Sequence, residues 1–210
     1  DGAPVTVPSQ DMVLGIYYLT IDKPNETGVI HSFKSVNEAL MAYENKLITL
    51  HEPIRVRRTG IDNEGKEVSK FVTSTLGRFI FNEVIPQDLG FVDRSKPENL
   101  LELEIDFVVG KKQLKPILER CINIHGATQT AELLDAIKAL GYKYATQAAF
   151  TVSISDMVVP KEKKEIIAEA EATIEKINME YRRGRMTEEE RYNTVIETWK
   201  EADNILTEKL

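Results

Sequence analysis

The sequence predicts an α+β protein, in which a mixed α/β domain of short strands and helices is followed by a long antiparallel helical hairpin. The hairpin is predicted by apolar residues that recur at steps of three and four, as they do along one face of an α-helix. The two series are Ile167, Ala170, Ile174, Ile177 and Tyr181, and then Tyr192, Val195, Trp199, Ala202 and Leu206. The mixed domain is predicted by the alternation of apolar and basic residues from Ile54 to Arg57, a strand pattern.

A short turn separates the two helical series. Gly184 suits the left-handed residue that ends a helix, and Thr187 with Glu190 three residues later forms a capping box that begins the next one. Helices joined by so short a turn fold back on each other, so we expect the two apolar stripes to face one another.

The composition is that of an ordinary globular chain of 210 residues, with 42% hydrophobic and 29% charged residues. No apolar run approaches the roughly 20 residues of a membrane-spanning helix. Cys121 is the single cysteine, which excludes an internal disulfide and favours a reducing compartment. The net charge of −7 argues against a broad nucleic-acid-binding surface. The sequence starts at Asp1 and its last helix reaches Leu210 without a stop signal, so we expect a fragment of a longer protein.

The first predicted helix follows Ser9, which can cap it. Residues 12–19 are so consistently apolar that we expect this helix to be buried nearly all round. Residues 21–34 have the composition of a loop. A capping box at residues 35–38 then predicts a short helix that ends near Glu44.

A β-hairpin is predicted next. Residues 54–57 form its first strand, residues 62–65 (Asp-Asn-Glu-Gly) its turn, and residues 71–73 the returning strand. The apolar segment at residues 79–81 follows, and it ends before Pro86.

Residues 101–107 alternate again, which predicts a strand with Glu102, Glu104 and Asp106 on one face. Three carboxylates could gather Mg²⁺, because they offer hard oxygen ligands. A solvated strand face is the favoured interpretation, because side chains two residues apart on a strand are too distant to close a compact shell unaided.

The pattern becomes helical from Gly110. Thr128 or Thr130 is expected to begin a second helix that Gly141 ends, and residues 152–155 are expected to form a short strand. The residues predicted to face inward are Leu114, Ile117, Leu118 and Cys121 in the first helix, and Ala131, Leu134, Ile137 and Leu140 in the second. Near Asp156 the mixed pattern gives way to the long amphipathic helices, so we expect one domain over residues 1–155 and another over residues 156–210.

Catalytic motifs of the common kinds are absent: the sequence has no phosphate-binding glycine loop, no G-x-S-x-G elbow and no H-E-x-x-H. His31, His51 and His125 stand apart from one another. Cys121 and His125 could share a helical face and bind zinc, but without further ligands a buried thiol beside a helix-end histidine is favoured.

Two charged groups remain as candidates for binding a partner. Lys161, Lys163 and Lys164 begin the first hairpin helix, where positive charge opposes the helix dipole. Such a cluster can contact a phosphate or an acidic partner, although a solvated helix end is the plainer interpretation. Arg191, Asn193 and Glu197 lie off the apolar stripe and are better candidates.

Several blocks of the sequence resemble, in the same order, the β′ subunit of bacterial DNA-directed RNA polymerase. They are residues 8–20, 76–82, 130–135, 142–146, 155–160 and 189–193, together with Val195, Ile196 and Trp199. The resemblance implies that residues 1–155 form the pore domain, beside the secondary channel through which nucleoside triphosphates enter and backtracked RNA leaves. It implies that residues 156–210 begin the funnel domain, with the hairpin at the channel rim where Gre-type transcript-cleavage factors and other regulatory factors dock.

The resemblance also implies roles for individual residues. Ser9, Gln10 and Asp11 would lie near the active centre, with no catalytic residue or metal ligand in this chain. The rim contacts to factors or to the alarmone guanosine tetraphosphate would be Arg191, Tyr192, Asn193 and Glu197. Some relatives carry lysine where this chain has Thr194, so we expect weaker alarmone binding here than in a lysine-bearing rim, as affinities measured in whole polymerase would test.

The family's catalytic Mg²⁺ is held by an aspartate-rich loop, Asn-Ala-Asp-Phe-Asp-Gly-Asp, which does not occur in this sequence. The loop would lie upstream of Asp1, so the chain alone would need no cofactor and would be inactive. In the whole enzyme the implied partners are the β, α, ω and σ subunits, template DNA, RNA and nucleoside triphosphates. The expected location is the bacterial cytoplasm, in association with the nucleoid and not with a membrane.

Two other functions are compatible with parts of the sequence. A free-standing interaction module could use the hairpin to bind a partner helix, but such a module should have clean termini. A stand-alone metal hydrolase could use Glu102, Glu104 and Asp106, but it lacks neighbouring histidines and a base.

Overall fold

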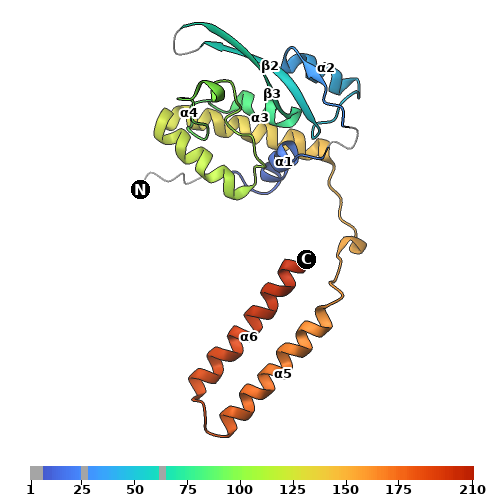
Figure 1. Cartoon of the computed structure of the whole chain (residues 1–210), viewed down its shortest axis with the longest axis vertical. Coiled ribbons are helices and arrows are strands. Elements are labelled where there is room, and N and C mark those ends of the chain that lie inside the picture. The colour runs from blue at the N-terminus through green and yellow to red at the C-terminus, as the bar shows by residue number, and fades with distance from the viewer. Residues whose placement is uncertain (1–6, 25–27, 62–64) are drawn as a thin grey trace. The chain divides into compact units, whose positions relative to one another are not determined.

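The computed structural model describes residues 7–24, 28–61 and 65–210, and it divides into two compact units, residues 1–150 and 151–210 (Figure 1). Its elements confirm the predicted α+β class, because the described residues form six α-helices and one three-stranded sheet. The assignment of residues 1–155 to a pore domain and 156–210 to a funnel domain stays a prediction.

The sheet has the strand order β1-β2-β3, with β1 at Ser32–Phe33, β2 at Pro53–Ile61 and β3 at Glu67–Thr75. The predicted β-hairpin is confirmed, since β2 and β3 pair antiparallel with Val56 opposite Val72. Residues 62–64 of its predicted turn lie outside the described residues. The prediction of a loop over residues 21–34 was wrong at its end, because β1 pairs in parallel with β2.

The helices of the first unit are α1 (Asp11–Thr20), α2 (Val36–Glu44), α3 (Leu76–Val84) and α4 (Lys111–Ala148), with a 3₁₀ turn at Pro97–Asn99. The predicted start of α2 is confirmed, because the Ser35 side chain accepts a hydrogen bond from the Glu38 amide. The apolar segment at residues 79–81 lies inside α3, which begins where the Thr75 hydroxyl accepts a hydrogen bond from the Arg78 amide.

Helix α1 packs closely against α3 and α4 because glycines allow these neighbours to approach it. A Cβ on Gly15 of α1 would lie 1.8 Å from the Gly141 oxygen of α4, and a Cβ on Gly77 of α3 would lie 1.8 Å from the Leu19 oxygen. Burial nearly all round was nevertheless a wrong prediction, since Leu14 is exposed on the side away from the core.

Three predicted helix boundaries were wrong. The residue before α1 is Gln10, with no capping side chain, and Ser9 contributes its backbone oxygen to the Met12 amide instead. In α4 the break falls at Gly126, which has a φ of 79°, and the Thr130 hydroxyl bonds back to the Gly126 oxygen. Gly141 does not end the helix, because it is the contact with α1.

The inward face of the second half of α4 differs from the prediction at Ala131. The buried residues there are Thr130, Leu133, Ile137, Gly141 and Tyr144. Ile137 was therefore predicted correctly, and Leu134 and Leu140 are half-buried and pack against the core, whereas Ala131 is exposed.

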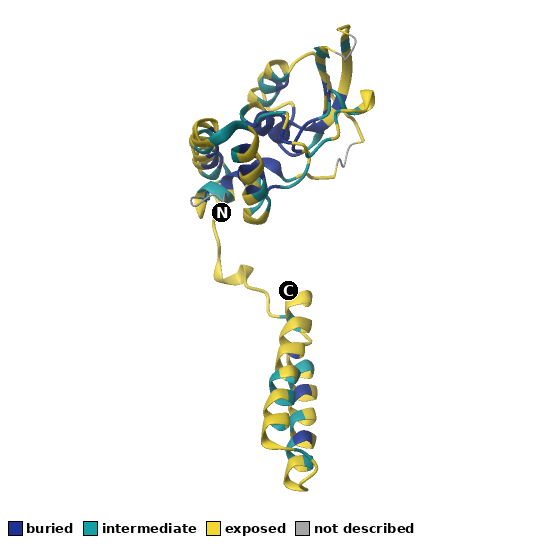
Figure 2. Ribbon diagram, turned by 90° about the vertical axis from the view of Figure 1, so that its left-hand side faces the viewer, coloured by how far each residue is buried: buried dark blue, intermediate teal, exposed yellow. Residues whose placement is uncertain are grey.

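The second unit is the predicted helical hairpin, formed by α5 (Lys163–Arg182) and α6 (Glu188–Lys209). Gly184 has the expected left-handed φ of 71°, and the predicted capping box of Thr187 and Glu190 is present. The residues buried between its helices are Ala170, Ile177 and Ala202, a small core that Figure 2 shows as isolated dark segments.

Two predictions in this unit were wrong. Three aromatic residues of the predicted stripes are exposed and not buried: Tyr181 (37%), Tyr192 (60%) and Trp199 (42%). Residues 152–155 form no strand: a 3₁₀ turn occupies Ile154–Asp156, and the residues around it are exposed.

Candidate functional site

The predicted binding residues of the hairpin lie in the first three turns of α6. The turn before them is fixed by the Arg185 amide bonding to the Glu180 oxygen (3.1 Å) and the Gly184 amide to the Tyr181 oxygen (2.9 Å). This pair of bonds closes α5 in a Schellman motif. Helix α6 then begins at the capping box of Thr187 and Glu190. The Thr187 amide and hydroxyl donate hydrogen bonds to the Glu190 carboxylate, and these bonds lower the pKa of that carboxyl.

Tyr192, Asn193 and Glu197 are exposed together on one side of α6, and we call them the α6 polar face. Asn193 and Glu197 are four residues apart, so they are neighbours along the helix surface. A phenol, an amide and a carboxylate offer hydrogen bonds and one negative charge to a partner. They include no nucleophile paired with a base.

Arg191 lies apart from the α6 polar face and turns toward α5. Its guanidinium lies 5.2 Å from the centre of the Tyr181 ring and 3.8 Å from the Glu188 carboxylate. Its Nε is buried and has no hydrogen-bond partner among the described residues. Arg191 therefore joins the two helices, and it is less available to a partner than its neighbours are.

A polar cluster at the tip of the hairpin was missed by the sequence analysis. The Glu180 carboxylate forms ion pairs with Arg185 at 2.9 Å and with Arg183 at 3.2 Å. The hydrogen bond from Arg185 is the main cause of the lowered pKa of Glu180. The signal in the sequence was the Arg-Arg-Gly-Arg run beside a helix-end glycine. These exposed pairs fix the position of the arginines at the turn more than they stabilise the fold.

Ser9, Gln10 and Asp11, which the resemblance places near an active centre, are all exposed at the start of α1. Gln10 has a φ of 51°, in the left-handed region that side chains rarely adopt. The structure thus holds this segment in an unusual backbone conformation and leaves its polar side chains accessible.

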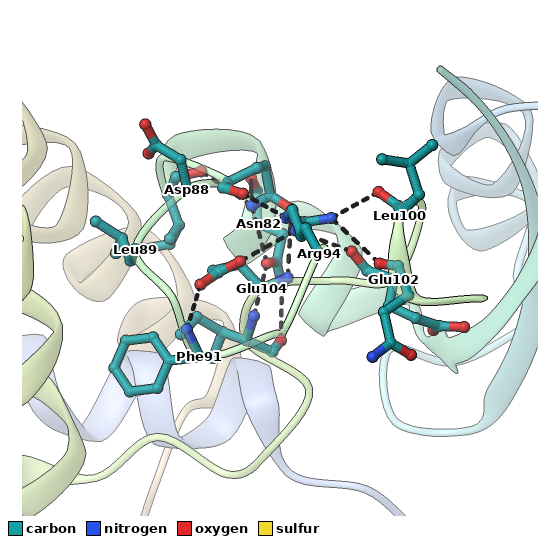
Figure 3. Close-up of polar contacts among 12 residues, drawn as sticks. Asn82, Asp88, Leu89, Phe91, Arg94, Leu100, Glu102 and Glu104 are labelled. Atoms are coloured by element: carbon teal, nitrogen blue, oxygen red, sulfur yellow. Dashed lines mark hydrogen bonds and ion pairs between the residues drawn. The ribbon is translucent and has the colours of Figure 1, made fainter. Parts of the chain in front are cut away.

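The predicted strand over residues 101–107, with a solvated acidic face, was wrong. The segment is irregular, because its backbone forms hydrogen bonds with side chains in place of a neighbouring strand. The side-chain amide of Asn82 donates to the Ile105 oxygen and accepts a hydrogen bond from the Ile105 N–H. Glu104 is buried, and Figure 3 shows its carboxylate between the Phe91 backbone and the Arg94 guanidinium. The two contacts measure 2.6 Å to the Phe91 nitrogen and 3.0 Å to Arg94 Nη2.

The three carboxylates of this segment do not converge on one point. Glu102 pairs with Lys70, and Asp106 accepts hydrogen bonds from Ser74 and Arg78. Within the described part of the chain, no three histidine, cysteine or acidic side chains come close enough together to hold a metal ion. The residues present therefore do not fit a catalytic Mg²⁺ site.

The remaining candidates are also separate. The Cys121 thiol is buried beside the Thr130 hydroxyl at 3.5 Å, whereas His125 Nε2 lies 2.7 Å from the Asp88 carboxylate, so the structure does not bring the cysteine and histidine together as ligands. Lys161, Lys163 and Lys164 are exposed around the start of α5. None of the helices in the described ranges has the length and apolar character needed to cross a membrane.

Comparison with known proteins gives one consistent result. The family described as RNA polymerase Rpb1, domain 3, matches residues 1–157. The chain is 69% identical to a protein of Lachnoclostridium phytofermentans named DNA-directed RNA polymerase subunit beta′, over 100% of this chain and 17% of that relative. Proteins of the same name from Caldicellulosiruptor saccharolyticus and Acetivibrio thermocellus are 54% and 55% identical, over 100% of this chain and 18% of each relative. The chain thus spans less than a fifth of the length of these relatives.

Proposed function

The chain belongs to the RNA polymerase Rpb1 domain 3 family, and from this premise we propose that it serves transcription as a segment of the β′ subunit of a bacterial DNA-directed RNA polymerase. The observation that carries this proposal is the similarity of all 210 residues to β′ subunits. It disfavours a free-standing hairpin module, since both units of the chain are similar to one larger protein.

Within the polymerase, we assign residues 1–155 to the pore domain beside the secondary channel and residues 156–210 to the start of the funnel. Ser9, Gln10 and Asp11 would then approach the active centre. The exposure of all three side chains at the start of α1 supports this placement. The partners would be the β, α, ω and σ subunits, with template DNA, RNA and entering nucleoside triphosphates in the complete enzyme, which would work in the cytoplasm at the nucleoid.

We assign to the hairpin the role of a docking rim for Gre-type transcript-cleavage factors. The support is its small core and its exposed α6 polar face, since a helix pair with few buried residues gains from contact with a partner. Glu197 supplies the charge for this contact and Asn193 is its neighbour on the helix surface. Tyr192 adds an exposed phenol, and Arg191 holds α6 against α5.

Binding of a purified Gre-type cleavage factor to this chain tests the assignment. Glu197→Lys is expected to weaken binding about tenfold, because it reverses a charge on the proposed contact face. Glu208→Lys, an equal charge reversal elsewhere on α6, is the matched control and should bind like the parent chain. Unchanged binding by the Glu197 variant, with helicity intact by circular dichroism, would exclude the α6 polar face as the contact.

Polymerisation is proposed to require parts of the β′ subunit other than this chain. Phosphoryl transfer by two metal ions needs converging carboxylates, and Glu102, Glu104 and Asp106 are each engaged elsewhere. Nucleotide incorporation by the purified chain, on a primed template with Mg²⁺, would refute this proposal.

A further inference from the structure

A cavity of about 390 Å³ in the first unit has no role in the proposed function. It lies where the end of α1, the end of α2 and the segment before β2 meet. The residues that line it are Tyr18, Lys23, Tyr43, Lys46, Ile48, Thr49, Leu50 and His51. The walls therefore combine three aromatic rings and two aliphatic side chains with two lysines.

His51 is the most informative residue of this cavity. Only 5% of its surface is exposed, yet neither ring nitrogen has a hydrogen-bond partner among the described residues. The Tyr18 ring packs edge-on against it at 4.6 Å. Burial lowers the pKa of His51, so the ring is neutral at pH 7 and offers one donor and one acceptor. An interaction with the Ile21 backbone partly opposes this lowering of the pKa. It lacks the geometry of a full hydrogen bond, so a partner for the buried ring is still expected, since buried polar atoms are nearly always paired in native proteins.

The two lysines supply positive charge to the same cavity. Both are exposed, and neither takes part in an ion pair within the described ranges. Lys23 is close enough to His51 that its charge contributes to lowering the histidine pKa. Among the described residues that line the cavity, none is acidic and could balance these charges.

Lys46 is held in the cavity wall by an unfavourable backbone conformation. Its φ is 59°, and the Leu47 amide bonds to the Ala42 oxygen and the Lys46 amide to the Tyr43 oxygen, both at 2.9 Å. This is a Schellman ending of α2, in which glycine is the favoured residue at the left-handed position. The backbone of a lysine is strained in this conformation, and strained backbone of this kind is often found at ligand sites.

We propose that this cavity binds a small aromatic anion. Its ring would pack among Tyr18, Tyr43 and His51, and its carboxylate or phosphate group would be held by Lys23 and Lys46. The wall of aromatic rings favours a flat apolar body, and two lysines without a counter-ion favour an anionic group. The volume lies within the range of small-ligand sites.

Titration of the ¹⁵N- and ¹³C-labelled chain tests this proposal by NMR, with benzoate and phenyl phosphate as the two anionic probes. The expected result is a saturable shift of the His51 ring signals with both probes. The dissociation constant should be smaller for the probe whose anionic group the lysines prefer. Lys23→Gln is expected to weaken binding about tenfold, the effect of one charge-assisted contact. Lys115→Gln removes an exposed lysine of α4 and should leave binding unchanged.

Lys46→Gly separates binding from folding. Glycine relieves the left-handed strain, so this variant is expected to melt at a higher temperature and still bind the probes about tenfold more weakly. The proposal fails if neither probe gives a saturable His51 shift, or if Lys46→Gly and Lys23→Gln bind like the parent. It fails equally if benzyl alcohol or inorganic phosphate binds as tightly as the aromatic anions, since one lacks the charge and the other lacks the ring.

Discussion

At the scale of single residues, Glu102 and Glu104 show how different two acidic side chains of one segment can be. The Glu102 side chain is 34% exposed and pairs with an exposed lysine, whereas the Glu104 side chain is fully buried. A buried carboxylate is tolerated only if its oxygens are bonded. Glu104 meets this condition through the Phe91 amide and the Arg94 guanidinium, and Arg94 in turn donates to the backbone oxygens of Gln87 and Leu100. One carboxylate thereby anchors an irregular segment to the core.

The same substitution at both positions tests this difference. Glu104→Gln keeps the shape but removes the buried charge that Arg94 requires, so we expect a loss of about 2 kcal/mol of unfolding free energy. Glu102→Gln should cost less than about 1 kcal/mol, because its ion pair is exposed to solvent. Urea unfolding followed by circular dichroism measures both. Equal losses in the two variants would contradict the assigned roles.

His51 gives a pH dependence with a defined sign. Burial lowers its pKa in the folded protein below the ordinary value of about 6.5. The unfolded chain therefore binds the proton more readily, so this contribution to stability is present above about pH 6.5 and is lost as the pH falls through the lowered pKa.

His51→Gln is accordingly expected to flatten the decline of the urea midpoint between pH 7 and pH 5. His31→Gln, at the exposed residue before β1, serves as the control and should retain the decline of the parent chain. If the His51 variant keeps the parent's slope, the histidine is not the group responsible.

At the scale of elements, the ends of α2 and α5 share one hydrogen-bonding pattern with different residues. Gly184 adopts the left-handed conformation after α5 without a steric penalty, whereas Lys46 adopts it after α2 at a cost. The end of α2 therefore has a backbone conformation that its residue type disfavours. The predicted end of α2 near Glu44 is confirmed, but only at Gly184 did the residue type indicate the left-handed conformation.

The contact between α1 and α4 depends on glycines as small residues and not as flexible ones. A Cβ at Gly141 would lie 2.6 Å from the Met12 oxygen, with only backbone atoms available to move. Gly141→Ala is therefore expected to destabilise the chain by about 3 kcal/mol, as overpacking does in a close helix contact.

The sign of this effect is diagnostic, because glycine to alanine inside a helix normally stabilises by about 1 kcal/mol. Gln147→Ala, at an exposed position of the same helix, should change stability by less than about 0.5 kcal/mol. A stabilised Gly141→Ala variant in urea unfolding would show that the two helices can separate without cost.

At the scale of the whole molecule, the two units differ in how much they bury. Residues 1–150 contain a continuous core that includes α1, α3, both long strands and α4. Residues 151–210 bury three small or medium side chains, and an isolated helix pair with so small a core is marginal in water. The hairpin therefore gains the most from a partner, in agreement with its proposed role at a rim.

Residues 1–150 produced alone are expected to fold, with an amide NMR spectrum that overlays on that of the intact chain. Residues 1–125 are the matched control and should not fold, because the cut removes the half of α4 that packs on α1. Residues 151–210 alone should lose helicity at a lower temperature than residues 1–150 do. Loss of structure in the 1–150 piece would mean that the hairpin is part of its folding unit.

The elements that can be predicted from the sequence alone are those whose signals are local. The hairpin helices, their glycine turn and capping box, the start of α2 and the β2–β3 pairing all follow from periodicity and from bonds between residues a few positions apart. The family resemblance rests likewise on contiguous blocks, and the match over residues 1–157 confirms it.

The features that depend on distant residues could not be predicted and became visible only in the folded chain. Alternation at residues 101–107 predicted a strand, but the Asn82 side chain supplies the bonds that a strand would have taken. The sequence predicted a helix end at Gly141, because the residues of α1 that Gly141 contacts are more than a hundred positions away in the chain. His51 has no partner residues near it in a recognisable sequence motif, but in the folded chain it lines a cavity together with Tyr18, Lys23 and Lys46. Close packing and burial bring such groups together, and neither is encoded in the spacing of neighbouring residues.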